Sequence, residues 1–396
     1  MISKPKFLDL YVGPRAIFDP NYIPPQLLFR KRELKSLNSL LTDSLYDEFS
    51  LNILYQGIQG IGKKSIFNKT LENLSVENKN SIQTIKIDCK EKGPEELIVS
   101  LLAEINNESN LNFNIDSLLN SKISSLWNTF KLASRKLAQD SYLLLIFNNI
   151  EYLEPETFRK FLHLGKELNI TTITTINNVL RTSTLDILSD FDQKNKLEFF
   201  TYNELFSILK QRASLTFLQE VDKELIELIT DLIFEYYVPV PGKGIDLFRD
   251  IYPSLKDQRY IKLNNMLEIS QNHFDTSGSI DEFSMLTFLS EEDLLTIIFL
   301  DNLSNHFITK PSYYITSKEL KELFDISCES LDFEKSSSEF KALIDILEKI
   351  GILSPSKKSI IEKKYISNDP LNCIHFFLIV NPNQLKAIID AVFGHQ

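Results

Sequence analysis

A glycine-rich turn between an apolar run and a helix-compatible segment constrains this chain more than any other feature. Residues 51–55 form the apolar run, and residues 57–65 read GIQGIGKKS. The spacing GxxxxGK is typical of phosphate-binding loops, in which backbone N–H groups and a helix N-terminus surround the phosphates. The pattern therefore predicts a strand, a nucleotide-binding turn and a helix. The residues expected around the phosphates are Gly57, Ile58, Gly60, Ile61, Gly62, Lys63, Lys64 and Ser65.

Two positions depart from the pattern of a working ATPase. Lys64 stands where a serine or threonine hydroxyl would coordinate Mg²⁺. The second departure follows residues 143–147, whose unbroken apolar character predicts a central strand buried on both faces. Hydrolysis needs a carboxylate after this strand to hold Mg²⁺ and another to activate water. Here Asn148 and Asn149 follow, and an amide is no base at neutral pH. Alternatively, the strand is structural and never had this role.

Another acid would have to replace the asparagines for the chain to hydrolyse ATP. Glu151 lies two residues too far along and Asp140 precedes the strand, so neither has the expected spacing. We therefore predict no catalytic residues and no metal ligands, and a site that binds ADP or ATP weakly or without Mg²⁺. The alternative is a pocket that serves only folding and holds no cofactor.

Composition narrows the class of protein. A chain of 396 residues suits about two or three domains. The net charge of −11 argues against a broadly basic surface for nucleic acid. Three widely spaced cysteines offer no disulfide framework, and no apolar run reaches the ~18 residues of a membrane span. We expect a cytoplasmic protein, nucleoid-associated if it binds DNA, with no membrane partner.

Hydrophobic periodicity divides the chain. Strand and helix patterns alternate up to residue 176, which predicts an α/β domain with a parallel sheet. Helical patterns follow, and after a polar linker come helices and a β ribbon in the order of a winged helix. The predicted parts are 1–201, an N-terminal arm and nucleotide-binding core; 202–271, a helical domain; 272–284, a linker; and 285–396, a winged-helix domain.

Seven segments, in this order and at fitting distances, resemble the replication-initiator branch of the AAA+ ATPases. This branch holds the archaeal origin-recognition and helicase-loading proteins, which are related to subunits of the eukaryotic origin recognition complex. The resemblance covers nearly the whole chain and implies a P-loop AAA+ parallel-sheet domain, an all-helical lid and a C-terminal winged-helix domain. The segments are 19–24 with Phe29 and Arg30, 57–65, 143–153, 176–178, 208–213, 244–249 and 347–352.

The resemblance also assigns residues outside the phosphate loop. It implies that Tyr22 and Arg30 lie near the adenine, that Asn148 and Asn177 lie near the phosphates, and that Arg212 from the lid contributes to the nucleotide site. Read without the resemblance, Arg30 is part of a basic, solvated helix start. Because a cation there opposes the helix dipole, a role near an anion remains the competing interpretation.

Two arginines of the family pattern are not found. Gly242, with Lys243 beside it, stands where the lid would supply an arginine to the γ-phosphate. The segment 186–188 has no finger arginine for a neighbouring subunit, although Arg181 lies a few residues upstream. Together with the changes at Lys64 and after the central strand, these departures predict a pseudo-ATPase.

In the resembled family, the winged helix and part of the ATPase domain contact origin DNA. The candidate recognition helix, residues 338–350, is net acidic, which makes sequence-specific reading through it unfavourable. The expected ribbon is lysine-rich and suits DNA-backbone contact, although a solvated β ribbon is an equal interpretation. The candidate DNA-binding residues are Lys357, Lys358, Lys363, Lys364, Ser337 and Lys341.

Two functions fit these observations. The first is a replication-initiator-like protein that binds origin-like double-stranded DNA, and ADP or ATP, but has lost hydrolysis. The second is a non-catalytic partner or scaffold subunit that docks on an active initiator paralogue and does not itself read DNA. The lysines of the ribbon favour the first, whereas the acidic net charge and the acidic helix favour the second.

Overall fold

A computed structural model describes most of the chain, which divides into two compact units. One unit comprises residues 30–57 and 63–197; the other comprises residues 1–29, 58–62 and 198–396. The described residues are 11–77, 82–90, 92–108, 114–119, 121–177, 186–218, 220–257, 289, 292–310, 312, 314–334, 336–356 and 375–394.

The first unit contains a parallel five-stranded sheet in the order β2-β3-β4-β1-β5. Its strands are β1 (Asn52–Gln56), β2 (Ile82–Asp88), β3 (Tyr142–Asn148), β4 (Thr171–Ile176) and β5 (Gln193–Lys196). The predicted α/β class and parallel sheet are confirmed. The sequence does not predict β5, because its four polar residues lack an apolar pattern. This strand forms through its pairing with β1 at the edge of the sheet.

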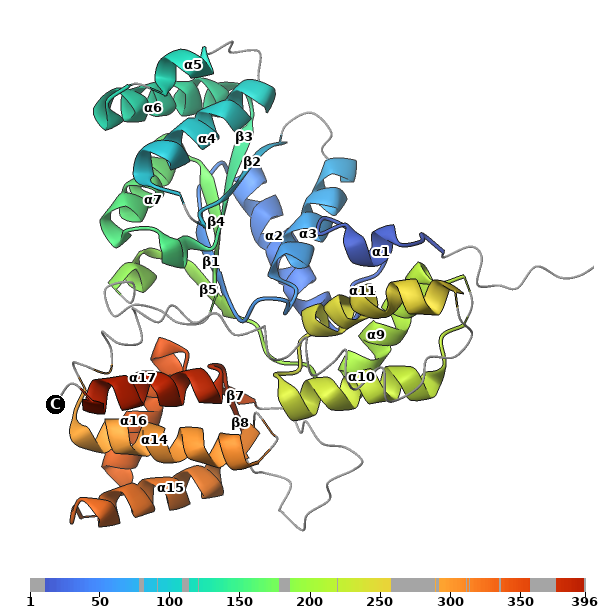
Figure 1. The fold of residues 1–396 in the computed structure, drawn as a ribbon. Coiled ribbons are helices and arrows are strands. Elements are labelled where there is room, and N and C mark those ends of the chain that lie inside the picture. Colours follow the sequence, from blue (N-terminus) through green and yellow to red (C-terminus); the bar gives the residue numbers. More distant parts are fainter. Residues whose placement is uncertain are drawn as a thin grey trace, which may run out of the picture. The chain divides into compact units, whose positions relative to one another are not determined.

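Helices cover both faces of this sheet (Figure 1). On one side lie α2 (Lys31–Tyr46) and α3 (Lys63–Glu77); on the other lie α4 (Pro94–Glu108), α6 (Ile123–Asp140) and α7 (Pro155–Leu168). The described residues of this unit also include the short elements α5 (Ile115–Leu118), η1 (Ile150–Tyr152) and η2 (Asp186–Asp190).

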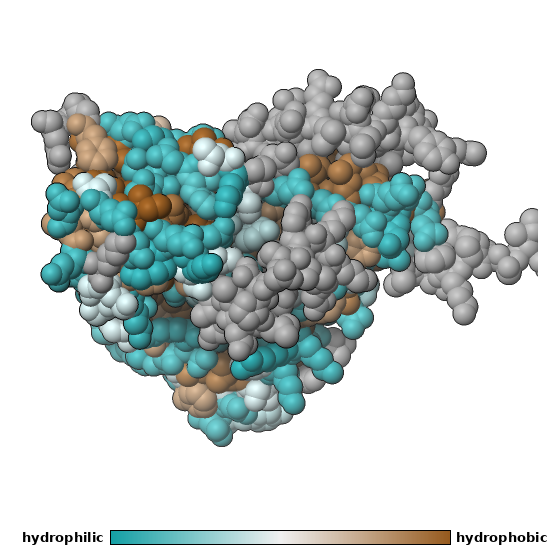
Figure 2. Space-filling view, turned by 90° about the horizontal axis from the view of Figure 1, so that it is seen from below, coloured by the Kyte–Doolittle hydropathy of each residue, from teal (hydrophilic) through white to brown (hydrophobic). Residues whose placement is uncertain are grey.

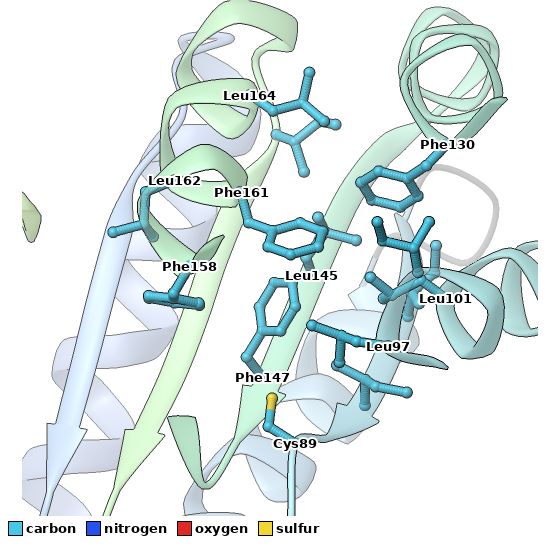
Figure 3. Packing of buried hydrophobic residues seen from close by; sticks show 14 of the residues in the cluster. Cys89, Leu97, Leu101, Phe130, Leu145, Phe147, Phe158, Phe161, Leu162 and Leu164 are labelled. Carbon is cyan, nitrogen blue, oxygen red and sulfur yellow. The ribbon is translucent and has the colours of Figure 1, made fainter. Parts of the chain in front are cut away.

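Aromatic side chains from β3 and α7 occupy the centre of the core (Figure 3). The ring of Phe147 meets those of Phe158 and Phe161 at centroid distances of 5.4 and 5.2 Å. Phe130 from α6 packs on Phe161 at 5.6 Å. This packing explains why residues 143–147 are unbroken in apolar character: β3 is a central strand with both faces buried.

The second unit begins with α1 (Arg15–Phe18) and three longer helices, α9 (Tyr202–Thr216), α10 (Lys223–Tyr236) and α11 (Pro241–Asp257). The longer three correspond to the helices predicted from apolar spacing. Helix α11 begins at Pro241, since proline fits the first turn of a helix, where its missing N–H is not needed. The sequence does not predict α1, which is one turn long.

Among the described residues from 292 onward, four helices combine with a small antiparallel sheet in the order β6-β8-β7. Thr316 and Glu319 form a capping box at the start of α15. These elements are those expected of a winged helix, but that domain assignment and the four domain boundaries stay predictions. The bounds are α14 (Leu294–Thr309), β6 (Tyr314–Thr316), α15 (Ser317–Ser330), α16 (Ser337–Ile350), β7 (Leu353–Ser356), β8 (His375–Leu378) and α17 (Pro382–Gly394).

Hydrophilic residues predominate on the face shown in Figure 2, where hydrophobic residues gather only in small separate groups. In the part of the chain that the structure describes, no helix combines the length and apolar character needed to cross a membrane. The predicted linker, residues 272–284, and the lysine-rich part of the expected ribbon lie outside the described residues.

Candidate nucleotide-binding site

The glycine-rich loop follows β1 and has the backbone of a phosphate cradle. The Gly57 N–H donates to the carbonyl oxygen of Ile176 at 3.3 Å, which ties the start of the loop to the end of β4. Gly60 and Gly62 have φ values of +85° and +105°, a region that glycine enters without steric strain. A Cβ atom at Gly62 would meet no described atom within 4 Å, so a ligand can approach the backbone there.

Lys63 opens α3 and turns its ammonium group into the site. The residue is 7% exposed, and Nζ donates to the carbonyl oxygen of Gly57 and, at 2.7 Å, to Oδ1 of Asn177. Burial lowers the pKa of Lys63 to about 7, and the charge of Lys64 acts in the same direction, whereas Glu151 opposes it. An anion bound at the loop would stabilise the charged form.

A continuous row of hydrogen bonds joins Lys63 to Lys64. Beyond the Lys63 contact, Nδ2 of Asn177 donates to Oδ1 of Asn149 at 2.7 Å, and Nδ2 of Asn149 donates to Oδ1 of Asp88 at 2.7 Å. The Lys64 ammonium lies 3.3 Å from Oδ2 of Asp88. These groups meet because the C-terminal ends of β2, β3 and β4 lie at one edge of the parallel sheet. Ligands bind at this edge in open α/β sheets.

The two asparagines after β3 differ in placement. Asn148 is 8% exposed; its Nδ2 donates to the carbonyl oxygen of Ile87 at 3.5 Å, and its Oδ1 accepts from the hydroxyl of Thr175 at 3.4 Å. Its side chain therefore bonds to the neighbouring strands β2 and β4. Asn149 has a left-handed backbone, with φ of +59°, and its side chain forms the hydrogen bonds to Asn177 and Asp88. The prediction of Asn148 as a nucleotide contact stays untested, while Asn149 lies nearer the loop side chains.

Two acids lie at the site that the sequence pattern did not indicate. Asp88 ends β2 and pairs in register with Asn148 of β3, so its place depends on the order of strands rather than on spacing along the chain. Glu151, in η1, is largely buried; burial raises the pKa of its carboxyl, opposed by hydrogen bonds from Asn177 and by the charge of Lys63. That Glu151 lies too far along to act as the base stays a prediction; its carboxyl group follows the left-handed turn at Asn149 and interacts with Asn177 and Lys63.

The donor set at this edge does not fit Mg²⁺. That ion requires near-octahedral oxygen ligands, usually from one or two carboxylates with waters and phosphates. The Asp88 carboxylate is already paired with an ammonium group and an amide. Among the described residues, no three His, Cys, Asp or Glu side chains come together in a way that could hold a metal ion. The loop and Lys63, by contrast, fit a phosphate.

In the other unit, Tyr22 and Arg212 come together. The Arg212 guanidinium lies 5.2 Å from the centroid of the Tyr22 ring, and Nη1 donates to the carbonyl oxygen of Ala16 at 2.8 Å. Arg249 of α11 donates to the carbonyl oxygen of Ile17. Both cations therefore stabilise the C-terminal turn of α1, where the helix dipole favours positive charge.

Arg30 and Gly242 also have defined places. Arg30 is 4% exposed and pairs with Glu33 at 3.1 Å, so it is not a solvated helix start. The Gly242 N–H donates to the carbonyl oxygen of Gly60 at 3.1 Å, and a Cβ atom at Gly242 would lie 2.6 Å from Cα of Gly60. An arginine at position 242 is therefore incompatible with this backbone contact. The ammonium group of Lys243 instead lies 4.8 Å from the centroid of the Tyr237 ring.

The DNA-binding candidates are only partly described. Ser337 is the first residue of α16, whose cap is the side chain of Ser336, and Lys341 lies exposed on the same helix. The candidates Lys357, Lys358, Lys363 and Lys364 lie outside the described residues, as does Arg181.

Comparisons place this architecture among known structures. No family model matches the chain, and no curated protein sequence matches it. The ORC2 protein of Aeropyrum pernix, solved as ADPNP-ADP complexes, aligns with a TM-score of 0.64 and 15% identity over 98% of this chain and 99% of that chain. The ORC1 protein of the same organism, in complex with DNA, aligns with a TM-score of 0.55 and 14% identity over 96% of each chain.

A third solved structure extends the likeness. Cdc6p of Pyrobaculum aerophilum aligns with a TM-score of 0.51 and 18% identity over 96% of this chain and 98% of that chain. At such identities the likeness shows the fold. The chain therefore has the fold of these archaeal origin-recognition proteins over nearly its whole length, and the predicted α/β domain with a parallel sheet is confirmed.

Proposed function

We propose that this chain is an AAA+ replication-initiator protein that binds an adenine nucleotide without hydrolysing it and contacts double-stranded DNA. The single observation that carries the nucleotide part is Lys63, a buried ammonium behind an open glycine loop. Burial lowers the pKa of this ammonium group to about 7, and a phosphate bound at the loop would favour its charged form. The fold shared with the ORC2 protein, which was solved with ADPNP and ADP, makes adenine nucleotides the class to test.

The proposed loss of hydrolysis rests on the groups after β3. Asn149 stands where a base would prime water, Asp88 is engaged by Lys64, and the Glu151 carboxyl is buried against Asn177. An arginine finger alone contributes a factor of roughly 10³–10⁵ in phosphoryl transfer. Loss of both the finger and the acids leaves little to accelerate the reaction.

Titration with a fluorescent ADP analogue, followed by a phosphate-release assay with ATP, tests both parts. We expect saturable binding that Lys63→Ala abolishes, and phosphate release no faster than in buffer. If the wild type fails to bind, the pocket serves only folding. If it releases phosphate at an ordinary enzymatic rate and Lys63→Ala stops it, the pseudo-ATPase proposal is wrong.

The proposed DNA contact rests on the fold shared with the DNA-bound ORC1 protein and on the four lysines of residues 357–364. A gel-shift assay on AT-rich duplex DNA at two salt concentrations tests it. Retardation at low salt that weakens steeply with salt is the expected result. Because α16 is net acidic, a non-reading partner of an active initiator paralogue is the second candidate. If the DNA is not retarded at low salt, the DNA-binding proposal is wrong and the partner of an active initiator paralogue remains.

A further inference from the structure

We infer that the Lys64–Asp88 ion pair stands in for the divalent cation of this site, and that Asp88 is the residue that decides whether nucleotide binding requires a metal. This inference rests on the nucleotide binding proposed above. It assigns a role to Asp88, which β2 supplies, and not only to the lysine that replaces the loop hydroxyl.

The geometry of Asp88 supports this role. In a working site the acid is expected at the end of β3. Asp88 ends the neighbouring strand, β2, and lies beside that position because it pairs in register with Asn148. One oxygen accepts from Asn149 at 2.7 Å and the other faces the Lys64 ammonium at 3.3 Å. The site therefore has an acid, Asp88, at this edge of the sheet, on β2 instead of β3. The ammonium group of Lys64 is paired with it.

The charges and hydrogen bonds around Asp88 keep its carboxylate ionised and disfavour a divalent cation beside it. Burial raises the pKa of Asp88, but hydrogen bonds from Asn149 and the Lys90 N–H, with the charge of Lys64, outweigh it and hold the pKa below its usual range. A divalent cation at this carboxylate would lie within a few ångströms of the ammonium group and be repelled. The ammonium belongs to the first turn of α3, where it can face a phosphate at the loop.

The side chains of Lys64 and Asp88 are 56% and 45% exposed, so the pair is easily altered without loss of the fold. Lys64→Thr restores a hydroxyl and removes the cation. Asp88→Asn keeps an oxygen to accept from Asn149 but removes the charge. Together the two changes form a cycle that separates a role of the pair from a general change in charge.

The experiment measures the dissociation constant of ADP in EDTA and in Mg²⁺ for the wild type, the two single variants and the double variant. In the wild type we expect equal constants. In Lys64→Thr, binding in EDTA weakens by about tenfold, as expected for loss of a cation near the phosphates. Mg²⁺ then restores it, and Lys64→Thr/Asp88→Asn loses that dependence. Lys69→Thr is the matched control, because Lys69 lies on the same helix and also pairs with a carboxylate, at 2.9 Å; it should behave as wild type.

Three results would overturn the inference: wild-type binding that requires Mg²⁺, metal-independent binding by Lys64→Thr, or Mg²⁺ dependence that survives in the double variant. If the wild type binds no ADP in either buffer, the proposed function fails instead. Water-proton relaxation with Mn²⁺ alone then decides the inference. Binding of Mn²⁺ by Lys64→Thr but not by the wild type or the double variant supports it, and equal behaviour of the three refutes it.

Discussion

At the scale of single residues, buried Lys63 is the most consequential group of the site. Its ammonium group donates to the Gly57 carbonyl oxygen and to the amide oxygen of Asn177. Burial nevertheless lowers the pKa of Lys63 to about 7, so folding disfavours the charged form. The unliganded protein therefore carries an unfavourable term that a bound phosphate removes, so stability and binding are linked through this one side chain.

Stability should respond to Lys63 in a pH-dependent way. The pKa falls from 10.5 to about 7 on folding, so the unfolded chain binds more protons between these values and the unfavourable term fades as pH rises. We expect Lys63→Met to be more stable than wild type by on the order of 2 kcal/mol at pH 6, with the difference much smaller at pH 10. Urea unfolding at both pH values measures this. A difference that stays constant with pH would contradict it.

The residues of the site were predictable from the sequence only where they follow a predicted strand at a recognisable spacing. The loop, Lys63 and Asn177 follow strand ends at recognisable spacing, and the structure brings Lys63 and Asn177 within 2.7 Å. Asp88 could not be found in this way, since its place depends on which strand becomes the neighbour of β3. The interaction of Glu151 with Lys63 could not be found from spacing either, because spacing along the chain ignores the turn that Asn149 makes.

At the scale of elements, the start of α11 and the phosphate loop form one backbone contact. The Gly242 N–H donates to the Gly60 carbonyl, and neither residue has room for a larger side chain on the contact side. The chain thus has glycine where the family resemblance implies an arginine. The glycine that removes the expected arginine side chain is the same residue that lets α11 approach the loop backbone this closely.

Gly242→Ala should therefore disturb the loop. Its Cβ would lie 2.6 Å from Cα of Gly60, so the backbone must shift, which costs about 1–3 kcal/mol in overpacked sites. We expect a lower thermal midpoint and weaker ADP binding. Gly93→Ala is the matched control, because its Cβ would meet no described atom within 4 Å. Equal effects of the two changes would show that the contact is unimportant.

At the scale of the whole molecule, the order of the segments along the chain predicted the fold better than any single segment did. Long elements with clear periodicity, such as β3 and α10, were predictable, and the fold is confirmed by structures only 14–18% identical. Short elements were not: β5, β6 and α1 have three or four residues each and form through pairing or packing with distant segments. Local patterns cannot carry that information.

Net charge should shape any contact with DNA. At −11, the protein as a whole repels phosphate, so binding must come from a local basic patch and be sensitive to salt. If the four lysines of residues 357–364 each contact a phosphate, their replacement by glutamine should reduce the slope of log K against log salt by about 3–4. Fluorescence anisotropy across a salt series measures the slope. Lys318→Gln and Lys321→Gln, on α15, serve as controls, and an unchanged slope in the fourfold variant would assign the contact elsewhere.

The left-handed turn at Asn149 has a consequence for regaining catalysis. Aspartate adopts this backbone as readily as asparagine, so Asn149→Asp should fold. Yet its carboxylate would face Asp88 at the 2.7 Å now spanned by an amide donor, and one of the two acids would have to keep a proton. We expect the variant to remain inactive in phosphate release, with activity at neutral pH as the contrary result. If hydrolysis is absent as proposed, regaining it would require coordinated substitutions on neighbouring strands, and a single substitution would not be sufficient.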